Sequence, residues 1–402
     1  MDDIKILKSL AWQVKEISEK PIQNQRREIW SDHNSLKKGP VPVFLNCGDW
    51  DVIGSEILTS EKLHCNDSFF REIEFNLRNK IFIDSVNDDS ITEPWYTIRP
   101  VFACTGWGVK INRFWREDSA TYHLEPAVSD DDDLRKLITP RHEINEELTQ
   151  NNYERTLEAI GDILPVYLDK APFYTDFEGD VSYWLGQLAG FEKILYQMYD
   201  KPEWLHKLLA HLRDGIGKTH AEAEASGHWT SASGHNQAMC YSHDIPCPNH
   251  EKTMPMNQIW GYFAAQEFEP VSPEMHKEFL LDYQMPLMEK FGLIAYGCCE
   301  DLTNKITMLR SIPNLRRIAV SPFADVKKCV EQIERDYVIS YRPNPASMAV
   351  TDWKPKEAAL SIKKELEFLK DSIFDVCMKD VTTVRGEVNR LADWVKAVKE
   401  LV

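Results

Sequence analysis

The alternation of apolar and polar residues in the second half of the chain predicts short buried strands separated by amphipathic helices. Apolar runs indicate strands at 293–296, 317–320, 337–341 and 373–377. Helical periodicity lies before, between and after them, at 273–291, 302–311, 323–335, 355–369 and 387–401. A regular alternation of strands and helices is typical of parallel strands that are joined by helical crossovers.

The first half of the chain extends this pattern less regularly. Further apolar runs lie at 42–45, 97–104, 163–168 and 237–241, and helical patterns lie at 3–20, 55–80, 143–160, 181–199 and 202–226. Seven or eight strand-helix units predict an α/β fold, a (β/α)8 TIM barrel with an N-terminal helical extension. We expect the extension to span 1–95 and to pack on a barrel that spans 96–402. A doubly wound sheet has the same periodicity, but the number of units favours the barrel, in which the loops after the strands carry the chemistry.

Composition narrows the class of protein. The chain has 402 residues, of which 43% are hydrophobic, enough to fill a large core. Its formal charge of −17 disfavours nucleic acids and anionic membrane surfaces as partners, because both would repel it. No stretch approaches the roughly 20 apolar residues of a membrane span, and the first residues do not form a signal peptide, so we expect a cytoplasmic protein. Nine scattered cysteines indicate reduced thiols, not a disulfide framework.

The strongest chemical signal is Tyr296-Gly297-Cys298-Cys299-Glu300, which directly follows an apolar strand. Two thiols beside a carboxylate at a strand end are suited to a soft divalent metal such as zinc, with a position left open for substrate. The alternative is that both cysteines are buried and act as small apolar residues.

Other clusters supply candidates for a substrate pocket. Segment 234–244 is rich in imidazole, thiol and carboxylate groups and leads into a proline-broken loop, which is either a binding loop or an ordinary surface loop. In segment 260–268, a glutamate among aromatic residues has either a raised pKa, which suits an acid or a metal ligand, or a solvent-facing position at a helix start. The candidates for substrate contact are Trp107, His235, Asn236, His243, Trp260 and Gln266, with Glu267 as acid or ligand. The chain contains neither a phosphate-binding P-loop nor a serine nucleophile elbow.

Several segments resemble the uroporphyrinogen decarboxylase superfamily from about residue 95 onward. Segment 181–206 contains Gly190-Phe191-Glu192 and Asp200-Lys201-Pro202-Glu203, and segment 272–279 begins with Ser272-Pro273, both similar to helices of that family. The resemblance implies a (β/α)8 barrel. The arginine-rich segment with which true uroporphyrinogen decarboxylases grip substrate carboxylates has no counterpart here, and Arg26-Arg27 is a poor substitute.

The likeness is greater to the branch of corrinoid-dependent methyltransferases, which bind zinc through a His-x-Cys at a strand end and a later cysteine. Tyr296-Gly297-Cys298 stands at the His-x-Cys position, so the cysteine is retained and the histidine is replaced. Cys377 follows Cys298 by 79 residues, where the second cysteine is expected. The resemblance therefore implies Cys298 and Cys377 as zinc ligands, with Cys299, Glu267, His243 or Asp380 in place of the histidine and Glu267 ranked first.

What this resemblance implies is methyl transfer between a small methylated substrate, such as a methyl ether, or a thiol, and a corrinoid (methylcobalamin) protein. The corrinoid would come with a partner, because this chain lacks the cobalt-ligating motif Asp-x-His-x-x-Gly. Glu267 would protonate the leaving group, Tyr296 and Asp380 would complete the catalytic set, and Lys379 would contact substrate. Two alternatives use the same barrel: a metal-free decarboxylase or other lyase, and a non-catalytic ligand-binding protein. Some members of the family are homodimers, which the resemblance allows here.

Overall fold

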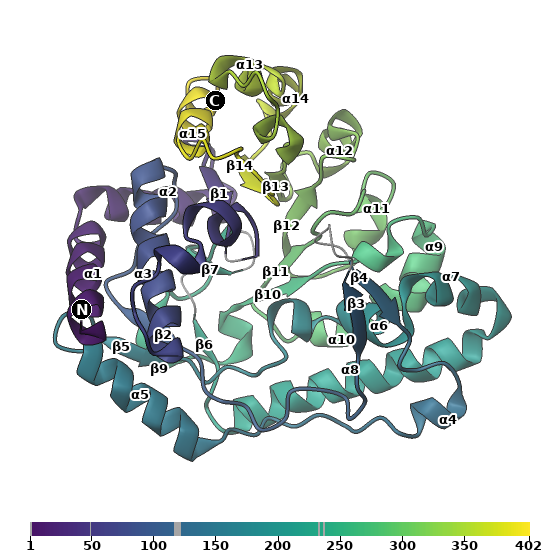
Figure 1. The fold of residues 1–402 in the computed structure, drawn as a ribbon. Helices are drawn as coiled ribbons and strands as arrows, with labels where there is room; N and C mark the ends of the chain where they lie inside the picture. The colour runs from purple at the N-terminus through teal and green to yellow at the C-terminus, as the bar shows by residue number, and fades with distance from the viewer. Residues whose placement is uncertain (1, 49, 116–121, 232–233, 236–237) are drawn as a thin grey trace.

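The computed structural model of the protein describes residues 2–48, 50–115, 122–231, 234–235 and 238–402. Its centre is a curled sheet of six parallel strands (Figure 1). In spatial order the strands are β1 (Val43–Asn46), β14 (Phe374–Lys379), β13 (Val338–Tyr341), β12 (Leu315–Val320), β11 (Leu293–Tyr296) and β10 (Trp260–Phe263). Because all six strands are parallel, their carboxyl ends lie along one edge of the sheet.

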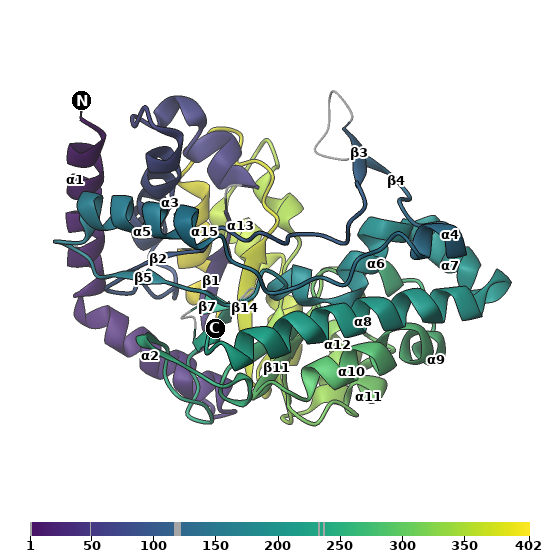
Figure 2. The same cartoon turned by 90° about the horizontal axis from the view of Figure 1, so that it is seen from below.

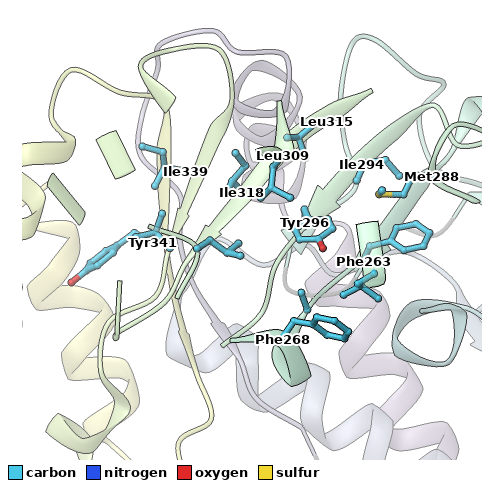
Figure 3. Close-up of a cluster of buried hydrophobic side chains, with 14 of the residues drawn as sticks. Phe263, Phe268, Met288, Ile294, Tyr296, Leu309, Leu315, Ile318, Ile339 and Tyr341 are labelled. Atoms are coloured by element: carbon cyan, nitrogen blue, oxygen red, sulfur yellow. The ribbon is translucent and has the colours of Figure 1, made fainter. Parts of the chain in front are cut away.

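Helices between these strands cover the outer face of the sheet. They are α9 (Pro273–His276) and α10 (Asp282–Met288), joined by the π-helix η6 (Lys277–Leu281), then α11 (Ile306–Leu309), α12 (Val326–Ile333), α13 (Pro355–Leu360), α14 (Lys363–Leu369) and α15 (Arg390–Lys399). Figure 3 shows the apolar layer between sheet and helices, in which Phe263, Ile294 and Ile318 lie beside Met288 and Leu309. Burial of both faces explains why the strands read as nearly continuous apolar runs.

A second, smaller layer lies to the side of the main sheet. Strands β2 (Tyr96–Ile98) and β5 (Val166–Leu168) form a parallel pair that shares an apolar cluster with α1 (Asp3–Ser18), α3 (Ser68–Val86) and α5 (Glu146–Ile160). Figure 2 shows this group and the helices α6 to α10 on opposite sides of the strands. The remaining elements are α2 (Pro21–Asn34), the hairpin β3 (Asn112–Trp115) and β4 (Tyr122–Glu125), α4 (Asp131–Leu134), α6 (Val181–Ala189), α7 (Phe191–Asp200) and α8 (Pro202–Ala225).

The prediction of a closed eight-stranded barrel is wrong in one respect. Within the described residues no ladder joins β1 to β2 or β5 to β10, so the α/β fold resembles a TIM barrel without being closed. Between α8 and β10 the described residues pair in two short antiparallel ladders: β6 (Thr230–Ser231) with β9 (Asn249–Thr253), and β7 (Gly234–His235) with β8 (Ala238–Met239). Pro246 and Pro248 lie between β8 and β9 and cannot donate ladder hydrogen bonds, so neither strand extends through them.

The first 95 residues do more than pack on the sheet. Strand β1 comes from this segment and pairs with the last strand, with Val43 opposite Val376 and Asn46 opposite Lys379. The segment predicted as an extension therefore contributes one strand to the main sheet as well as the helices α1, α2 and α3. Among the described residues, no helix is long and apolar enough to cross a membrane.

Candidate functional site

Two cysteines mark the carboxyl end of β11. The chain turns there at Gly297, whose φ of +99° is strained for any other residue and whose added Cβ would lie 2.7 Å from Leu302. Cys298 is 2% exposed, and Cys299 is partly exposed. Their sulfur atoms lie 3.5 Å apart. The turn thus brings two thiols together at the edge where the strand ends meet.

Lys379, the last residue of β14, reaches both sulfur atoms. Its Nζ lies 3.1 Å from Sγ of Cys298 and 3.2 Å from Sγ of Cys299. The ammonium also lies 3.0 Å from Oδ2 of Asp380, which accepts a hydrogen bond from the Cys299 thiol at 3.4 Å. Burial opposes the charged amine, but the charges of Cys298, Cys299 and Asp380 outweigh it and raise the pKa of Lys379. Lys379 is therefore a fixed cation that stabilises negative charge on sulfur.

A second buried cation follows β13. Arg342 is 4% exposed and donates from Nη1 to the backbone carbonyl of Cys298. Burial opposes its charge, yet the pKa of Arg342 is raised, because the Cys298 sulfur and the Tyr262 phenol favour the guanidinium. Two positive groups from neighbouring strands therefore converge on Cys298.

Glu300 fixes the geometry of the turn that carries the thiols. Its Oε2 accepts from the backbone N–H of Cys298 at 2.8 Å, and its Oε1 accepts from that of Ala265 at 2.7 Å. The ends of β10 and β11 are thereby joined through one carboxylate. Burial, followed by the charge of Cys298, raises the pKa of Glu300. This side chain positions the turn and has both oxygens occupied by backbone donors.

Glu267 lies just beyond β10, in the short 3-10 helix η5 (Gln266–Phe268). It accepts a hydrogen bond from the Ser182 hydroxyl at the start of α6. Burial raises the pKa of Glu267 to about 7, and the charges of Glu300 and Cys298 act in the same direction. A carboxyl group with this pKa exchanges a proton near neutral pH, which suits a general acid.

Tyr296 points away from the thiols. It is 1% exposed, and its hydroxyl donates to Oε1 of Gln284 at 2.9 Å and lies 3.0 Å from Nε2 of His276, among the helices that cover the outer face (Figure 3). Gln284 in turn donates to Asp180 at 2.7 Å. Strand β11 ends at Tyr296, and the turn at Gly297, with its φ of +99°, breaks the alternation of side chains, so Cys298 does not continue the face of Tyr296. The structure places Tyr296 in a buried polar network that supports β11.

Cys377 lies inside the sheet, deeper than the mouth. It is fully buried in a cluster with Trp30 and Phe44, two residues before Lys379 on β14. Residues 377 and 379 share a face because the side-chain period of a strand is two. The residue that β14 presents to Cys298 and Cys299 is therefore Lys379.

The thiol pair matches part of what zinc requires. Two thiolates on one tetrahedral zinc ion lie about 3.8 Å apart, close to the separation of Cys298 and Cys299. Asp380 adds an oxygen near Cys299. Across the described residues, no ligand atom of a third His, Cys, Asp or Glu residue, Asp380 included, lies within 4.8 Å of both sulfurs. Of the predicted ligands, Cys298 and Cys299 are brought together, whereas Cys377 and Glu267 do not complete a group of three with them.

A small cavity adjoins the thiol site through Tyr262. Its volume is about 90 Å³, and its wall combines aromatic residues with polar ones, among them Arg99 and Asp169. The aromatic residues that line it are Trp229, Trp260, Tyr262, Phe263 and Phe291. Tyr262 packs with Cys298 in a separate apolar cluster and donates to the Gly297 carbonyl at 3.2 Å. The predicted pocket residue Trp260 does line a cavity.

The other predicted pocket residues lie elsewhere. Trp107 is 1% exposed and packs in the core against Tyr174 and Trp184, and Gln266 is exposed. His243 lies on the surface, where Nε2 is 2.8 Å from Oδ1 of Asp32. The backbone of His235 forms strand β7, and Asn236 lies outside the described residues.

Arg342 was absent from the sequence-based prediction, and the roles of Tyr262 and Glu300 were not predicted. Arg342 directly follows the apolar run of β13, so the rule that functional residues follow strands could have found it. Tyr262 and Glu300 lie within the clusters that drew attention, but only the folded chain shows which atoms they contact. The common signal is a polar residue at or just after the end of a buried strand.

Comparison with known proteins assigns no family. No protein-family model matches the chain, and no curated protein matches it. A solved structure described as a methyltransferase from Methanosarcina mazei aligns with 92% of this chain and 96% of that chain, at 12% identity and a TM-score of 0.49. At that level of similarity it assigns neither a reaction nor a family to this chain, so function must be inferred from the side chains. The resemblance to the uroporphyrinogen decarboxylase superfamily stays a prediction.

Proposed function

We propose that this protein is a methyltransferase whose reaction takes place at Cys298 and Cys299. The observation that carries the proposal is the pair of sulfur atoms 3.5 Å apart at the carboxyl end of β11, with the Lys379 ammonium in contact with both. Paired thiolates are soft donors that select zinc, and a zinc-bound heteroatom or thiol is a suitable partner for methyl transfer. The substrate is a small methylated compound, such as a methyl ether, or a thiol, and the second methyl carrier is a corrinoid protein.

The residues of this chain have distinct tasks in that reaction. Cys298 and Cys299 would hold zinc, with Asp380 as the nearest oxygen donor, and the metal would polarise the heteroatom that carries the methyl group. Lys379 and Arg342 stabilise negative charge that develops beside the sulfurs. Glu267 delivers a proton to the departing heteroatom, because its carboxyl group is still protonated in part near pH 7.

The test uses the purified protein made with zinc supplied. Metal content is measured by mass spectrometry, and methyl transfer from methylcobalamin to 2-mercaptoethanol is followed by the absorbance of the corrinoid. We expect bound zinc near one per chain and a loss of at least about 100-fold in rate for Cys298→Ser. Cys247→Ser, at an exposed thiol far from β11 in the sequence, is the matched control and should keep full activity. Equal rates for both variants would refute the proposal.

A metal-free lyase that acts on a small carboxylate is the second candidate. It is favoured by Lys379 and Arg342, two buried cations at the same mouth, since a carboxylate substrate would pair with them. Dialysis against a chelator separates the two functions. Loss of activity with the metal, and its return with added zinc, supports methyl transfer, whereas activity that persists without metal supports the lyase.

A further inference from the structure

We propose that Cys298 and Cys299 form a reversible disulfide between adjacent residues, which switches the site off under oxidising conditions. The inference regulates the site of the proposed function, but it does not depend on which reaction that site performs. It rests on the 3.5 Å separation of the two sulfurs. Bond formation requires these atoms to approach to about 2.05 Å, a shift that takes rotation of the two side chains together with a distortion of the backbone between them.

The two thiols differ in exposure and in hydrogen bonding, and this difference determines which of them reacts first. Cys299 is partly exposed and its thiol donates to Oδ2 of Asp380, whereas Cys298 is 2% exposed behind it. A small oxidant from solvent therefore meets Cys299 first. The hydrogen bond with Cys298, followed by burial, raises the pKa of Cys299, so Cys299 is a protonated thiol and Oδ2 of Asp380 accepts its proton as the sulfur attacks. Lys379 donates to both sulfurs and stabilises the negative charge that develops on them.

With a peroxide as oxidant, the steps balance. The sulfur of Cys299 attacks one peroxide oxygen, the O–O bond breaks, and hydrogen peroxide leaves one water molecule and a sulfenic acid on Cys299. The sulfur of Cys298 then attacks the Cys299 sulfur, the S–O bond breaks, and the hydroxyl group leaves with the proton of the Cys298 thiol as a second water molecule. Two thiols and one hydrogen peroxide give one disulfide and two water molecules, so the thiols are oxidised by two electrons and the peroxide is reduced.

The product is suited to a switch because it is strained. Adjacent Cα atoms are about 3.8 Å apart across a trans peptide, below the roughly 4.4–6.8 Å that disulfides normally span. Strained disulfides are reduced more easily than structural ones, so a cellular thiol can restore the pair. While the disulfide is present, neither sulfur can bind a metal or a substrate as a thiolate. Of the three groups that contact the Lys379 ammonium, namely the two sulfurs and Asp380, only the Asp380 carboxylate, at 3.0 Å, still carries negative charge.

The experiment exposes the full-length protein to hydrogen peroxide and measures the mass of the peptide that contains both cysteines. We expect a loss of two hydrogen atoms at this peptide and full reversal by dithiothreitol. In Cys298→Ser the reaction should stop at a Cys299 sulfenic acid that dimedone traps. Circular dichroism checks that the variant is folded, and Cys247→Ser should behave as the unmodified protein.

Two outcomes would overturn the inference: direct oxidation of Cys299 to sulfinic acid in the unmodified protein, or no change at this peptide while Cys247 is oxidised. A failed methyl-transfer assay leaves the mass measurement unaffected. Conversely, a protein that transfers methyl groups but never forms the disulfide contradicts only the switch. The two proposals can therefore fail separately.

Discussion

Nζ of Lys379 lies 3.1 Å from Sγ of Cys298, although 81 positions separate the two residues in the chain. The contact joins the ends of β14 and β11, which are not neighbours in the sheet, because β13 and β12 lie between them. The sheet must therefore curl for the two side chains to meet. Curling of the sheet is what converts a row of strand ends into a site.

Removal of the Lys379 charge should make the thiols less reactive. Lys379→Met leaves Cys298 and Cys299 without the ammonium that stabilises their anionic forms, so their alkylation by iodoacetamide at neutral pH should slow by about tenfold. Peptide mass spectrometry measures the rate, with the exposed Cys247 as internal standard. Lys379→Arg keeps the positive charge, so its alkylation rate should lie between the rates of the unmodified protein and of Lys379→Met. An unchanged rate in the methionine variant would show that the lysine does not activate the thiols.

Glu267 should impose a limit on activity at high pH. Burial raises its pKa to about 7, so the protonated form, which donates the proton, disappears as the pH rises through that value. The rate of methyl transfer should fall above about pH 7 in the unmodified protein. Glu267→Gln cannot donate this proton, so its profile should be low and flat in the same range. A profile of the glutamine variant that still bends near pH 7 would assign the limit to another group.

The buried ion pair beneath the site should dominate the stability of the sheet. Nη2 of Arg317 lies 2.7 Å from Oδ2 of Asp375, and His33 and Ser340 donate to the same carboxylate at 2.9 and 3.0 Å. Asp375→Asn leaves the Arg317 charge buried without its counter-charge, which costs about 3–5 kcal/mol of unfolding free energy. Urea unfolding measures this cost.

The control for that substitution lies on the same segment. Asp371→Asn, at an exposed position shortly before β14, should change the unfolding free energy by less than about 0.5 kcal/mol. The double variant of Asp375→Asn with Arg317→Met should recover stability, because it removes the unpaired charge. If the double variant is less stable than the single one, the arginine contributes through packing and not through its charge.

A pair of histidines should make stability depend on pH. Nε2 of His142 lies 2.8 Å from Nδ1 of His228, and burial, followed by the charge of His228, lowers the pKa of His142 to about 4, while Glu222 acts in the opposite direction. Unfolded histidine binds a proton near 6.5, so between 6.5 and 4 the unfolded state holds more protons. The unfolding free energy should therefore fall as the pH falls through this range.

Substitution of the partner isolates this contribution. His228→Asn removes the second imidazole, so the pKa of His142 should rise toward its ordinary value and the fall in stability below pH 6.5 should become shallower. Urea unfolding at three pH values, compared with the unmodified protein, measures the slope. Identical slopes in both proteins would mean that other buried histidines, such as His220 and His276, account for the acid sensitivity.

Much of the fold follows from local patterns. The strand predicted at 293–296 coincides with β11, and those predicted near 317–320, 337–341 and 373–377 correspond to β12, β13 and β14 within two residues at each end. These strands are buried on both faces, so their apolar runs are unambiguous. The helix predicted at 181–199 is two helices, because Gly190 has a φ of +75° and the chain turns between α6 and α7.

The site was predicted less completely, for a physical reason. A strand end identifies Cys298 and Cys299, since the loop after a parallel strand is where functional groups gather. The sequence does not show which residue of a strand lies at the carboxyl edge of the sheet. Cys377 and Lys379 share one face of β14, and only the register against β1 and β13 shows that Lys379 is the one at that edge. Whether the sheet closes depends on long-range pairing, which local periodicity does not encode.

The pairing of β1 with β14 determines when the candidate site can be assembled during synthesis. Residues 43–46 leave the ribosome early, but the strand with which they pair, residues 374–379, is synthesised near the end of the chain. Until residues 374–379 have been synthesised, the edge of β1 that pairs with β14 is unpaired, and no Lys379 ammonium contacts the thiols. A nascent chain can therefore form the helices around β2 and β5 before its candidate site is complete. A chain truncated before β14 would lack Lys379 and therefore lack the complete site.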